Sequence, residues 1–514
     1  MPIGNNILAG ASGQATGYDI DQSLRFDDGS SPYLSKTFAG AGNQRTFTFS
    51  GWYKKCTTGA SQIIISTIPD SDHRFYLYFS ATGQIAVYGQ TGGGANQINL
   101  VSTPLYRDPS AWYHIVLAVD TTQVVAANRL KVYVNGEQVT AWTTETYCAL
   151  NYQCEINSTD PMLLGTYADG LYSFLDGYLA EVNFIDGQAL TPASFGETNS
   201  ATNQWQAIEY DGTYGTNGFY LKFQDSSALG DDSSGNTNDF SATNLVATDQ
   251  MVDSPTNNFA TLNPLDNYYA GSTLSEGNLE VAQSGSIYTF NTSTIKMPSG
   301  TKWYWEFLWS SFTGSDAWAH PGISSLVSSA TNDWPGGKAT SWSYTSNSGQ
   351  LYNNNSGTSY GDSFAAGDII GVAVDLVNNK LYFSKNGTWQ NSGVPTSGST
   401  GTGAVSITAG DYFALLGKSD TDGYTFVSNF GADSSFAGNE TAQGNQDGND
   451  IGDFYYSPPS GYLALCSDNL PDPSIADPTK HFNTKLYTGN DTTNAITGVG
   501  FQPDLTWMKC RVTA

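Results

Sequence analysis

Basic residues are scarce in this chain of 514 residues. It carries 20 Lys and Arg against 47 Asp and Glu, which gives a formal net charge of −27 at pH 7. A surface of that sign repels the phosphate backbone of nucleic acids and an anionic membrane surface. We therefore expect no nucleic-acid partner, and solubility is a sufficient reason for the acidity.

Cysteines and long apolar runs are also few. The five cysteines form an odd, widely spaced set without a Cys-x-x-Cys pair, which disfavours a disulfide framework and a zinc site. Cys148 and Cys154 are close enough in sequence to close a small loop, although buried free thiols are favoured. No stretch approaches the ~20 apolar residues that span a bilayer, so we expect no membrane insertion. The first residues contain neither a basic nor an apolar segment, so we expect no secretory signal.

Helical periodicity is missing as well. No sustained run repeats apolar residues every 3.6 positions, as an amphipathic helix would. Charged residues make up only 13% of the chain and aromatic residues another 13%, beside many Gly, Ser, Thr and Asn. This composition favours short strands joined by polar turns, and the length exceeds that of one core. We predict an all-β protein of two or three domains.

A repeated hairpin pattern supports that prediction. Residues 112–120 end in Ala-Val-Asp and are followed by an alternating strand that ends at Asn135-Gly136. Residues 367–375 also end in Ala-Val-Asp, and their alternating strand ends at Asn386-Gly387. Asn-Gly between alternating strands is a strong signal for a type I′ turn. Two such units, about 250 residues apart, predict two β-sandwiches of related build.

The first of these regions resembles the laminin-G-like branch of the concanavalin A-like jelly rolls. The matching segments are residues 23–27, 49–52, 112–114, 130–136 and 176–182. The Asp-Ser-Ser-Gly-Asn loop at residues 232–236 comes first in many such domains and last in this one, as in a permuted order. The second region resembles a SPRY (B30.2) domain, through the Trp-Tyr-Trp-Glu strand at 303–306 and the hairpin at 382–387.

These signals predict a complete layout, in which two concanavalin A-like jelly-roll β-sandwiches stand in tandem before a short C-terminal β segment. The expected regions are an N-terminal arm (1–20), a laminin-G-like sandwich (21–245), a connector (246–275), a SPRY-like sandwich (276–435), a Pro-punctuated linker (436–475) and a partial C-terminal β module (476–514).

The order of these modules resembles that of large structural proteins of tailed bacteriophages, particularly marine ones. That resemblance implies a virion protein, made in the host cytoplasm and displayed on the virion surface. The implied role is that of a tail fibre, commonly trimeric, that binds a host cell-surface glycan or protein. Contacts with other virion proteins would use residues 1–20 and 476–514. The alternative to attachment is an architectural role, in capsid decoration, a collar or a tail adaptor. The third candidate role is that of a polysaccharide depolymerase.

Catalysis is the least favoured of these roles. Retaining glycoside hydrolases need two carboxylates ~5 Å apart, which on one strand means alternate positions. The nearest pair, Glu181 and Asp186, has an odd spacing, and Glu306 stands alone among aromatic residues. The four histidines lack a metal-binding spacing. We therefore predict a protein that is not an enzyme.

Calcium is the one cofactor that the resemblance suggests, because laminin-G-like folds often hold Ca²⁺ in oxygen-rich loops. The candidate ligands are Asp27, Asp28, Asp232, Asn236 and Asn238. The alternative is that these residues only form turns, for which Asp, Asn and Gly are equally suited.

Aromatic side chains in polar loops are the candidate ligand contacts, since a sugar ring stacks on an exposed aromatic ring while polar neighbours bind its hydroxyls. The candidates are Trp318, Trp334, Trp342 and Tyr344 in the second domain, and Tyr167 and Tyr172 in the first. Packing is the alternative for each of them.

Overall fold

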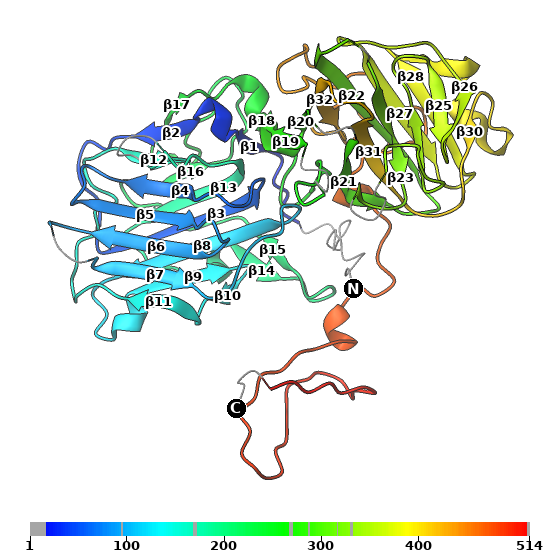
Figure 1. Cartoon of the computed structure of the whole chain (residues 1–514). Helices are drawn as coiled ribbons and strands as arrows, with labels where there is room; N and C mark the ends of the chain where they lie inside the picture. The colour runs from blue at the N-terminus through cyan, green and yellow to red at the C-terminus, as the bar shows by residue number, and fades with distance from the viewer. Residues whose placement is uncertain are drawn as a thin grey trace.

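Two β-sandwiches lie side by side, and a C-terminal segment extends away from them (Figure 1). The computed structural model describes residues 17–93, 96–167, 172–266, 271–285, 288–315, 317–328 and 333–510. Nearly all regular structure in these ranges is antiparallel β, which confirms the predicted fold class. In the described ranges, no helix is both long and apolar enough to cross a membrane.

The first sandwich consists of two eight-stranded sheets. One sheet runs in the order β10 (Glu137–Gln138), β9 (Leu130–Val134), β8 (Trp112–Asp120), β3 (Thr46–Lys55), β13 (Gly177–Asp186), β1 (Ser23–Phe26) and β18 (Gln250–Met251), with β16 (Phe219–Leu221) paired to β13. The other runs in the order β11 (Trp142–Thr146), β7 (Ile98–Ser102), β6 (Ile85–Gln90), β5 (Arg74–Phe79), β4 (Gln62–Thr67), β12 (Met162–Leu164), β2 (Tyr33–Lys36) and β17 (Ser241–Thr243).

The second sandwich is built in the same way from an eight-stranded and a six-stranded sheet. The first of these contains β19 (Ser272–Ser275), β20 (Glu280–Gln283), β32 (Gly423–Asn429), β22 (Lys302–Thr313), β27 (Ile369–Asp375), β28 (Lys380–Lys385) and β29 (Thr388–Trp389), with β30 (Val405–Ser406) paired to β28. The other contains β21 (Thr289–Met297), β31 (Tyr412–Lys418), β23 (Ala319–Ser324), β24 (Ser341–Tyr344), β25 (Gln350–Asn353) and β26 (Ser356–Ser359).

Short elements complete the chain. The hairpin β14 (Gly196–Thr198) and β15 (Trp205–Ala207) forms a separate two-stranded sheet. The 3-10 turns are η1 (Asp28–Ser30), η2 (Ala126–Asn128), η3 (Pro192–Ser194), η4 (Ala247–Asp249), η5 (Glu276–Asn278), η6 (Gln390–Ser392), η7 (Pro395–Thr400), η8 (Ser467–Asn469) and η9 (Pro478–Lys480).

Both predicted hairpins are present, and their backbones have the conformation that a type I′ turn requires. Asn135 and Gly136 have φ of 49° and 81°, and Asn386 and Gly387 have φ of 48° and 77°. Asn and Gly adopt positive φ at the lowest cost, so the two dipeptides fix the turns and with them the strand registers.

The region 436–475, expected to be a linker, packs on the second sandwich as far as Leu470. Phe436, Phe454, Tyr462 and Leu465 are fully buried. Leu463 donates its N–H to the Lys302 carbonyl at 3.0 Å, which adds a backbone bridge to β22. The expected linker is therefore part of the second core. The proline and glycine residues of this region predicted its turns. They did not predict that the aromatic residues between the turns would be buried and anchor the chain.

The C-terminal segment differs from the sequence prediction in another way. Residues 471–510 are all described and contain η9 but no strand. Leu486, Leu505 and Trp507 are 79%, 87% and 90% exposed. The structure therefore shows no β module in residues 476–510, and the three apolar side chains named above face solvent. Of the expected N-terminal arm, residues 1–16 lie outside the described ranges, whereas Ile20 is buried in the apolar cluster that includes the core of the second sandwich.

A continuous interface joins the two sandwiches, and we call it the junction. Trp112, Tyr178 and Met251 of the first sandwich belong to the same apolar cluster as the core of the second. Phe259, in the expected connector, is buried in that cluster and bridges to Cys466. The two domains are thus packed together and not merely tethered.

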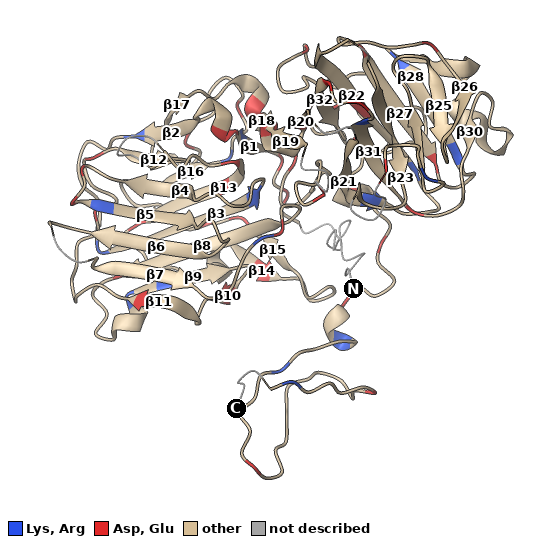
Figure 2. Ribbon diagram, viewed as in Figure 1, with Lys and Arg blue, Asp and Glu red and all other residues tan. Residues whose placement is uncertain are grey.

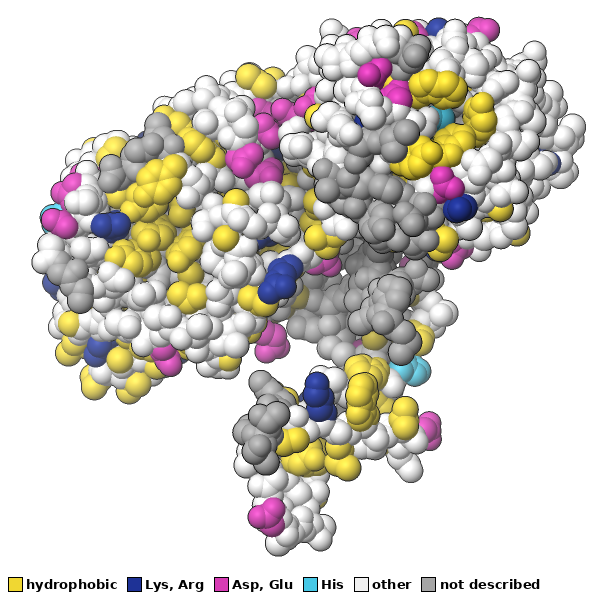
Figure 3. All heavy atoms as spheres, in the orientation of Figure 1, with side chains coloured by type: hydrophobic (Ala, Val, Ile, Leu, Met, Phe, Trp, Pro, Cys, Tyr) yellow, Lys and Arg dark blue, Asp and Glu magenta, His cyan; other side chains and the backbone are white. Residues whose placement is uncertain are grey.

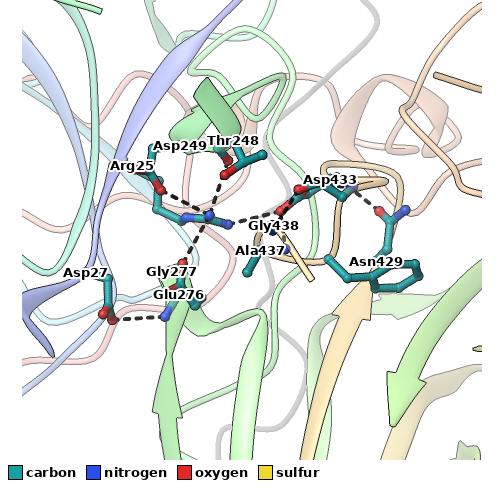
Figure 4. Close-up of polar contacts among 12 residues, drawn as sticks. Arg25, Asp27, Thr248, Asp249, Glu276, Gly277, Asn429, Asp433, Ala437 and Gly438 are labelled. Carbon is teal, nitrogen blue, oxygen red and sulfur yellow. Dashed lines mark hydrogen bonds and ion pairs between the residues drawn. The ribbon is translucent and has the colours of Figure 1, made fainter. Parts of the chain in front are cut away.

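Arg25 is the polar centre of the junction (Figure 4). Its side chain is 1% exposed and forms ion pairs with Asp249 at 3.2 Å, Glu276 at 3.0 Å and Asp433 at 3.2 Å. It also donates to the Thr248 carbonyl. Because Arg25 belongs to β1 and Asp433 follows β32, one guanidinium links a strand of the first sandwich to the loop after a strand of the second. Acidic side chains gather where the two sandwiches meet (Figures 2 and 3).

Candidate ligand-binding surfaces

Tyrosine side chains cover part of one outer face of the first sandwich. Strand β5 alternates, so that Phe75, Leu77 and Phe79 are buried in the core while Tyr76 and Tyr78 point outward and stay half-buried. Tyr88 of β6 lies directly opposite Tyr76 in the strand register. We call this surface, with Arg74, Tyr167 and Tyr172, the tyrosine face, and Figure 3 shows hydrophobic side chains gathered over β4–β6.

The rings of the tyrosine face contact one another in series. Ring centroids are 4.9 Å apart for Tyr76 and Tyr88, 5.2 Å for Tyr76 and Tyr78, and 5.3 Å for Tyr76 and Tyr167. Tyr172 stacks on Tyr167 at 4.5 Å and is 52% exposed. Ile63 and Ile68 are buried beneath these rings. A packed floor of this kind holds the rings in fixed positions.

Polar groups border the rings. Arg74 donates from Nη1 to the Tyr167 hydroxyl at 3.0 Å, and its guanidinium lies 5.8 Å from the centroid of the Tyr88 ring. The Tyr88 hydroxyl donates to Gln90 Oε1 at 3.0 Å. Flat apolar rings beside fixed hydrogen-bonding groups are suited to stacking a sugar ring while its hydroxyls are bound.

Sequence reasoning identified Tyr167 and Tyr172, and the structure brings these two together. It missed Tyr76, Tyr78 and Tyr88, although the alternation of apolar and polar aromatic residues in β5 was visible. Such a pattern predicts an outward row of rings, but not which other strands lie beside that row.

A second aromatic surface lies on the second sandwich, and we call it the tryptophan face (Figure 3). Trp318, Trp334 and Tyr352 surround the buried His320, with ring centroids 6.4, 5.2 and 6.5 Å from the imidazole. Trp334 donates from Nε1 to Asn355 Oδ1 at 3.1 Å. Burial lowers the pKa of His320 to about 3, so the imidazole at the centre of this face is neutral near pH 7.

The other two predicted aromatic contacts of the second domain are corrected by the structure. Trp342 and Tyr344 lie in β24, not in a loop, and are 5% and 0% exposed. Tyr344 packs against Phe364 and Phe383 in the core. The Gly/Ser/Asn-rich surroundings suggested a loop, but a short strand flanked by small residues has the same composition.

Asp27 and Asp28 lie together, as the calcium prediction requires, but their third neighbour is Asp176. One carboxylate oxygen from each of these residues lies within 4.8 Å of the other two. Burial and the charges of Asp28 and Asp27 raise the pKa of Asp176 well above its usual range. Burial and Asp27 also raise the pKa of Asp28. Carboxylate oxygens at this spacing fit a hard cation such as Ca²⁺.

Asp232, Asn236 and Asn238 do not join that cluster. Asp232 accepts hydrogen bonds from the N–H groups of Tyr220, Ser234 and Asn238. Asn236 and Asn238 each donate a side-chain N–H to the Gly218 carbonyl at 2.9 Å. These side chains fix a turn, which is the alternative that the sequence left open.

Two of the carboxylates considered for catalysis, Glu181 and Glu306, are buried and already hydrogen-bonded. Glu181 accepts from the hydroxyls of Tyr18 and Tyr220, both at 2.6 Å. Glu306 accepts from the N–H groups of Tyr455 and Tyr456 at 2.8 and 2.7 Å. Each of these acids thus anchors a neighbouring segment.

Family models match three parts of the chain. The concanavalin A-like lectin/glucanases superfamily, in its laminin G form, matches residues 28–194. The first sandwich is a concanavalin A-like domain. The SPRY domain model matches residues 302–410, so the second sandwich is a SPRY domain. Residues 477–514 match a domain of unknown function, DUF7483.

Solved structures resemble one domain at a time. The SPRY domain of human HERC1 is 16% identical over 32% of this chain and 96% of its own, with a TM-score of 0.27. A heptameric SAP-like pentraxin from Limulus polyphemus is 19% identical over 34% and 80%, with a TM-score of 0.25. The CBM40 of a Ruminococcus gnavus IT-sialidase, bound to alpha2,3 sialyllactose, is 18% identical over 34% and 93%, with a TM-score of 0.24. No curated protein matches the chain.

Proposed function

We propose that this protein is a non-catalytic recognition protein of a tailed-phage virion that attaches to glycan on the host cell surface. The observation that carries the proposal is the tyrosine face of the concanavalin A-like domain. Its rings rest on buried Ile63 and Ile68, and Tyr172 is 52% exposed. A rigid, partly exposed aromatic surface loses little conformational entropy when a sugar ring stacks on it.

Binding without catalysis is supported by the acids of this domain. Glu181 is held by two tyrosine hydroxyls, and Asp186 accepts from the N–H groups of Asn43 and Asn217. Both carboxylates therefore have structural partners in place of a substrate. The phage assignment rests on the resemblance in the order of the modules, and the virion surface is the proposed location.

An architectural role is the second candidate, and the C-terminal segment favours it. Leu505 and Trp507 are almost fully exposed, and Phe482 is 73% exposed. Side chains of this kind suit contacts with other virion proteins or with further copies of this chain in a trimer. The two roles are compatible in one fibre, because the tyrosine face and the C-terminal segment are separate surfaces.

The proposal predicts that Tyr76→Ala and Tyr88→Ala each weaken binding to host cells at least about tenfold. Each change removes one stacking surface from the centre of the face. Binding of the labelled protein to cells and to their isolated surface polysaccharide is the measurement. Tyr33→Ala, on β2 of the same sheet but outside the tyrosine face, is the matched control.

Four outcomes separate the candidates. Loss of binding in the tyrosine-face variants with retention in Tyr33→Ala supports glycan attachment. Loss only in Trp334→Ala assigns recognition to the tryptophan face. Wild-type protein that binds other virion proteins but no host cell contradicts the attachment role and leaves the architectural one. Release of reducing sugar from host polysaccharide contradicts the absence of catalysis.

A further inference from the structure

Asp27, Asp28 and Asp176 gather three carboxylates in the described part of the chain, and the Lys55 ammonium acts on Asp176 without forming an ion pair with it. None of the three takes part in an ion pair there. Asp176 is 6% exposed, and its buried Oδ1 has no hydrogen-bond partner among the described residues. A buried carboxylate with an unpartnered oxygen, in a residue that also gathers with two further carboxylates, is costly unless a cation neutralises it.

The donor set indicates which cation would bind. Asp27 lies between β1 and η1, Asp28 is the first residue of η1, and Asp176 directly precedes β13, so all three lie in or next to regular structure. Hard oxygen donors without histidine or cysteine suit Ca²⁺, which takes six to eight oxygens in flexible geometry. Asp28 is exposed, which leaves a side open for water ligands.

Two of these three residues are connected to η5, which follows β19 of the second sandwich: Asp27 through its carboxylate and Asp176 through its backbone. Asp27 Oδ1 accepts the N–H of Glu276 at 3.0 Å, and Figure 4 shows this contact beside Arg25. The Asp176 carbonyl accepts the N–H of Cys56, whose own carbonyl accepts from Asn278 Nδ2 at 2.9 Å.

The turn that receives these bonds is strained. Glu276, Gly277 and Asn278 have φ of 52°, 66° and 64°, and three consecutive residues in the left-handed region need outside contacts to hold them. The Tyr178 hydroxyl supplies one such contact, because it donates to the Gly277 carbonyl at 2.8 Å.

We propose that Asp27, Asp28 and Asp176 bind a divalent cation, Ca²⁺, which fixes the junction between the concanavalin A-like domain and the SPRY domain. The cation positions Asp27 to accept from Glu276, and it holds Asp176 and Cys56 in register with Asn278. This proposal goes beyond the proposed function and is independent of it, because it concerns the junction and not the tyrosine face.

Calcium binding to the full chain tests the site. We expect saturable binding in calorimetry and a thermal midpoint roughly 5 °C higher when free Ca²⁺ is a hundred times its Kd. Asp28→Asn and Asp176→Asn should each weaken binding at least about tenfold. Asp28 is exposed, so Asp28→Asn remains informative if Asp176→Asn fails to fold. Asp211→Asn, a change at an exposed acid of the same domain, is the matched control.

Hydrogen exchange tests the coupling to the junction. Calcium should slow exchange both in residues 24–31 and in residues 272–281, while residues 341–344 of β24 stay unchanged. Absence of binding by folded protein, or binding that both variants retain, overturns the site. Slower exchange in residues 24–31 alone overturns the role at the junction. Host-cell binding that survives EDTA leaves the proposed function intact whatever the result for calcium.

Discussion

Arg25→Met is expected to lower the free energy of unfolding by about 4 kcal/mol. Arg25 is 1% exposed and pairs with Asp249, Glu276 and Asp433, which place three carboxyl groups around one guanidinium. Methionine fills much of the volume but leaves these acids without a cation at the junction. A buried charge that loses its partner costs more than the pair itself contributed. Urea denaturation followed by tryptophan fluorescence measures the effect.

Arg45→Met is the control for this experiment, because it removes the same charge from an exposed position in the same domain. It should change stability by less than about 0.5 kcal/mol. If the two variants were equally stable, the ion pairs of Arg25 would contribute nothing to the junction.

A second expected effect of Arg25→Met is separation of the unfolding of the two domains, since Arg25 links β1 to the residues that follow β32. Calorimetry would then show two transitions in place of one cooperative transition.

The sandwiches could be predicted because their signals are local. Asn135-Gly136 and Asn386-Gly387 determine their turns within a few residues, and the strands around them alternate with period two. The region 436–475 was misread for the same reason. Its turns are local, but Phe454 packs against Tyr304 and the Tyr462 hydroxyl donates to the Pro395 carbonyl, and both partners lie more than fifty positions away.

The candidate surfaces were harder to predict, because each one combines distant segments. Tyr76 meets Tyr88 through one hairpin, but it meets Tyr167 only because β12 lies beside β4 in the sheet. Asp176 joins Asp27 through the pairing of β13 with β1, across about 150 residues of chain. Trp342 shows the opposite error, since a polar neighbourhood in sequence does not determine burial.

His114 makes the stability of the concanavalin A-like domain sensitive to acid. The side chain is 1% exposed, and burial lowers its pKa to about 3 from the ordinary 6.5. Trp205 donates from Nε1 to Nδ1 at 3.0 Å, so the ring proton is on Nε2, which donates to Ser50 Oγ at 2.9 Å. The native state therefore holds the neutral imidazole in a complete set of hydrogen bonds.

The expected result is a pH-dependent difference between wild type and His114→Gln. Below pH 6.5 the unfolded chain takes up a proton that native His114 refuses, so the stability contributed by His114 falls as the pH decreases toward 3. The glutamine side chain takes up no proton in this pH range, so it contributes no such pH dependence. The stability advantage of wild type over His114→Gln should therefore shrink by about 3 kcal/mol between pH 7 and pH 4. Urea denaturation at the two pH values measures it, and His481→Gln, at an exposed position, is the control. A difference that stays constant with pH would mean that the folded protein protonates His114 as readily as the unfolded chain does.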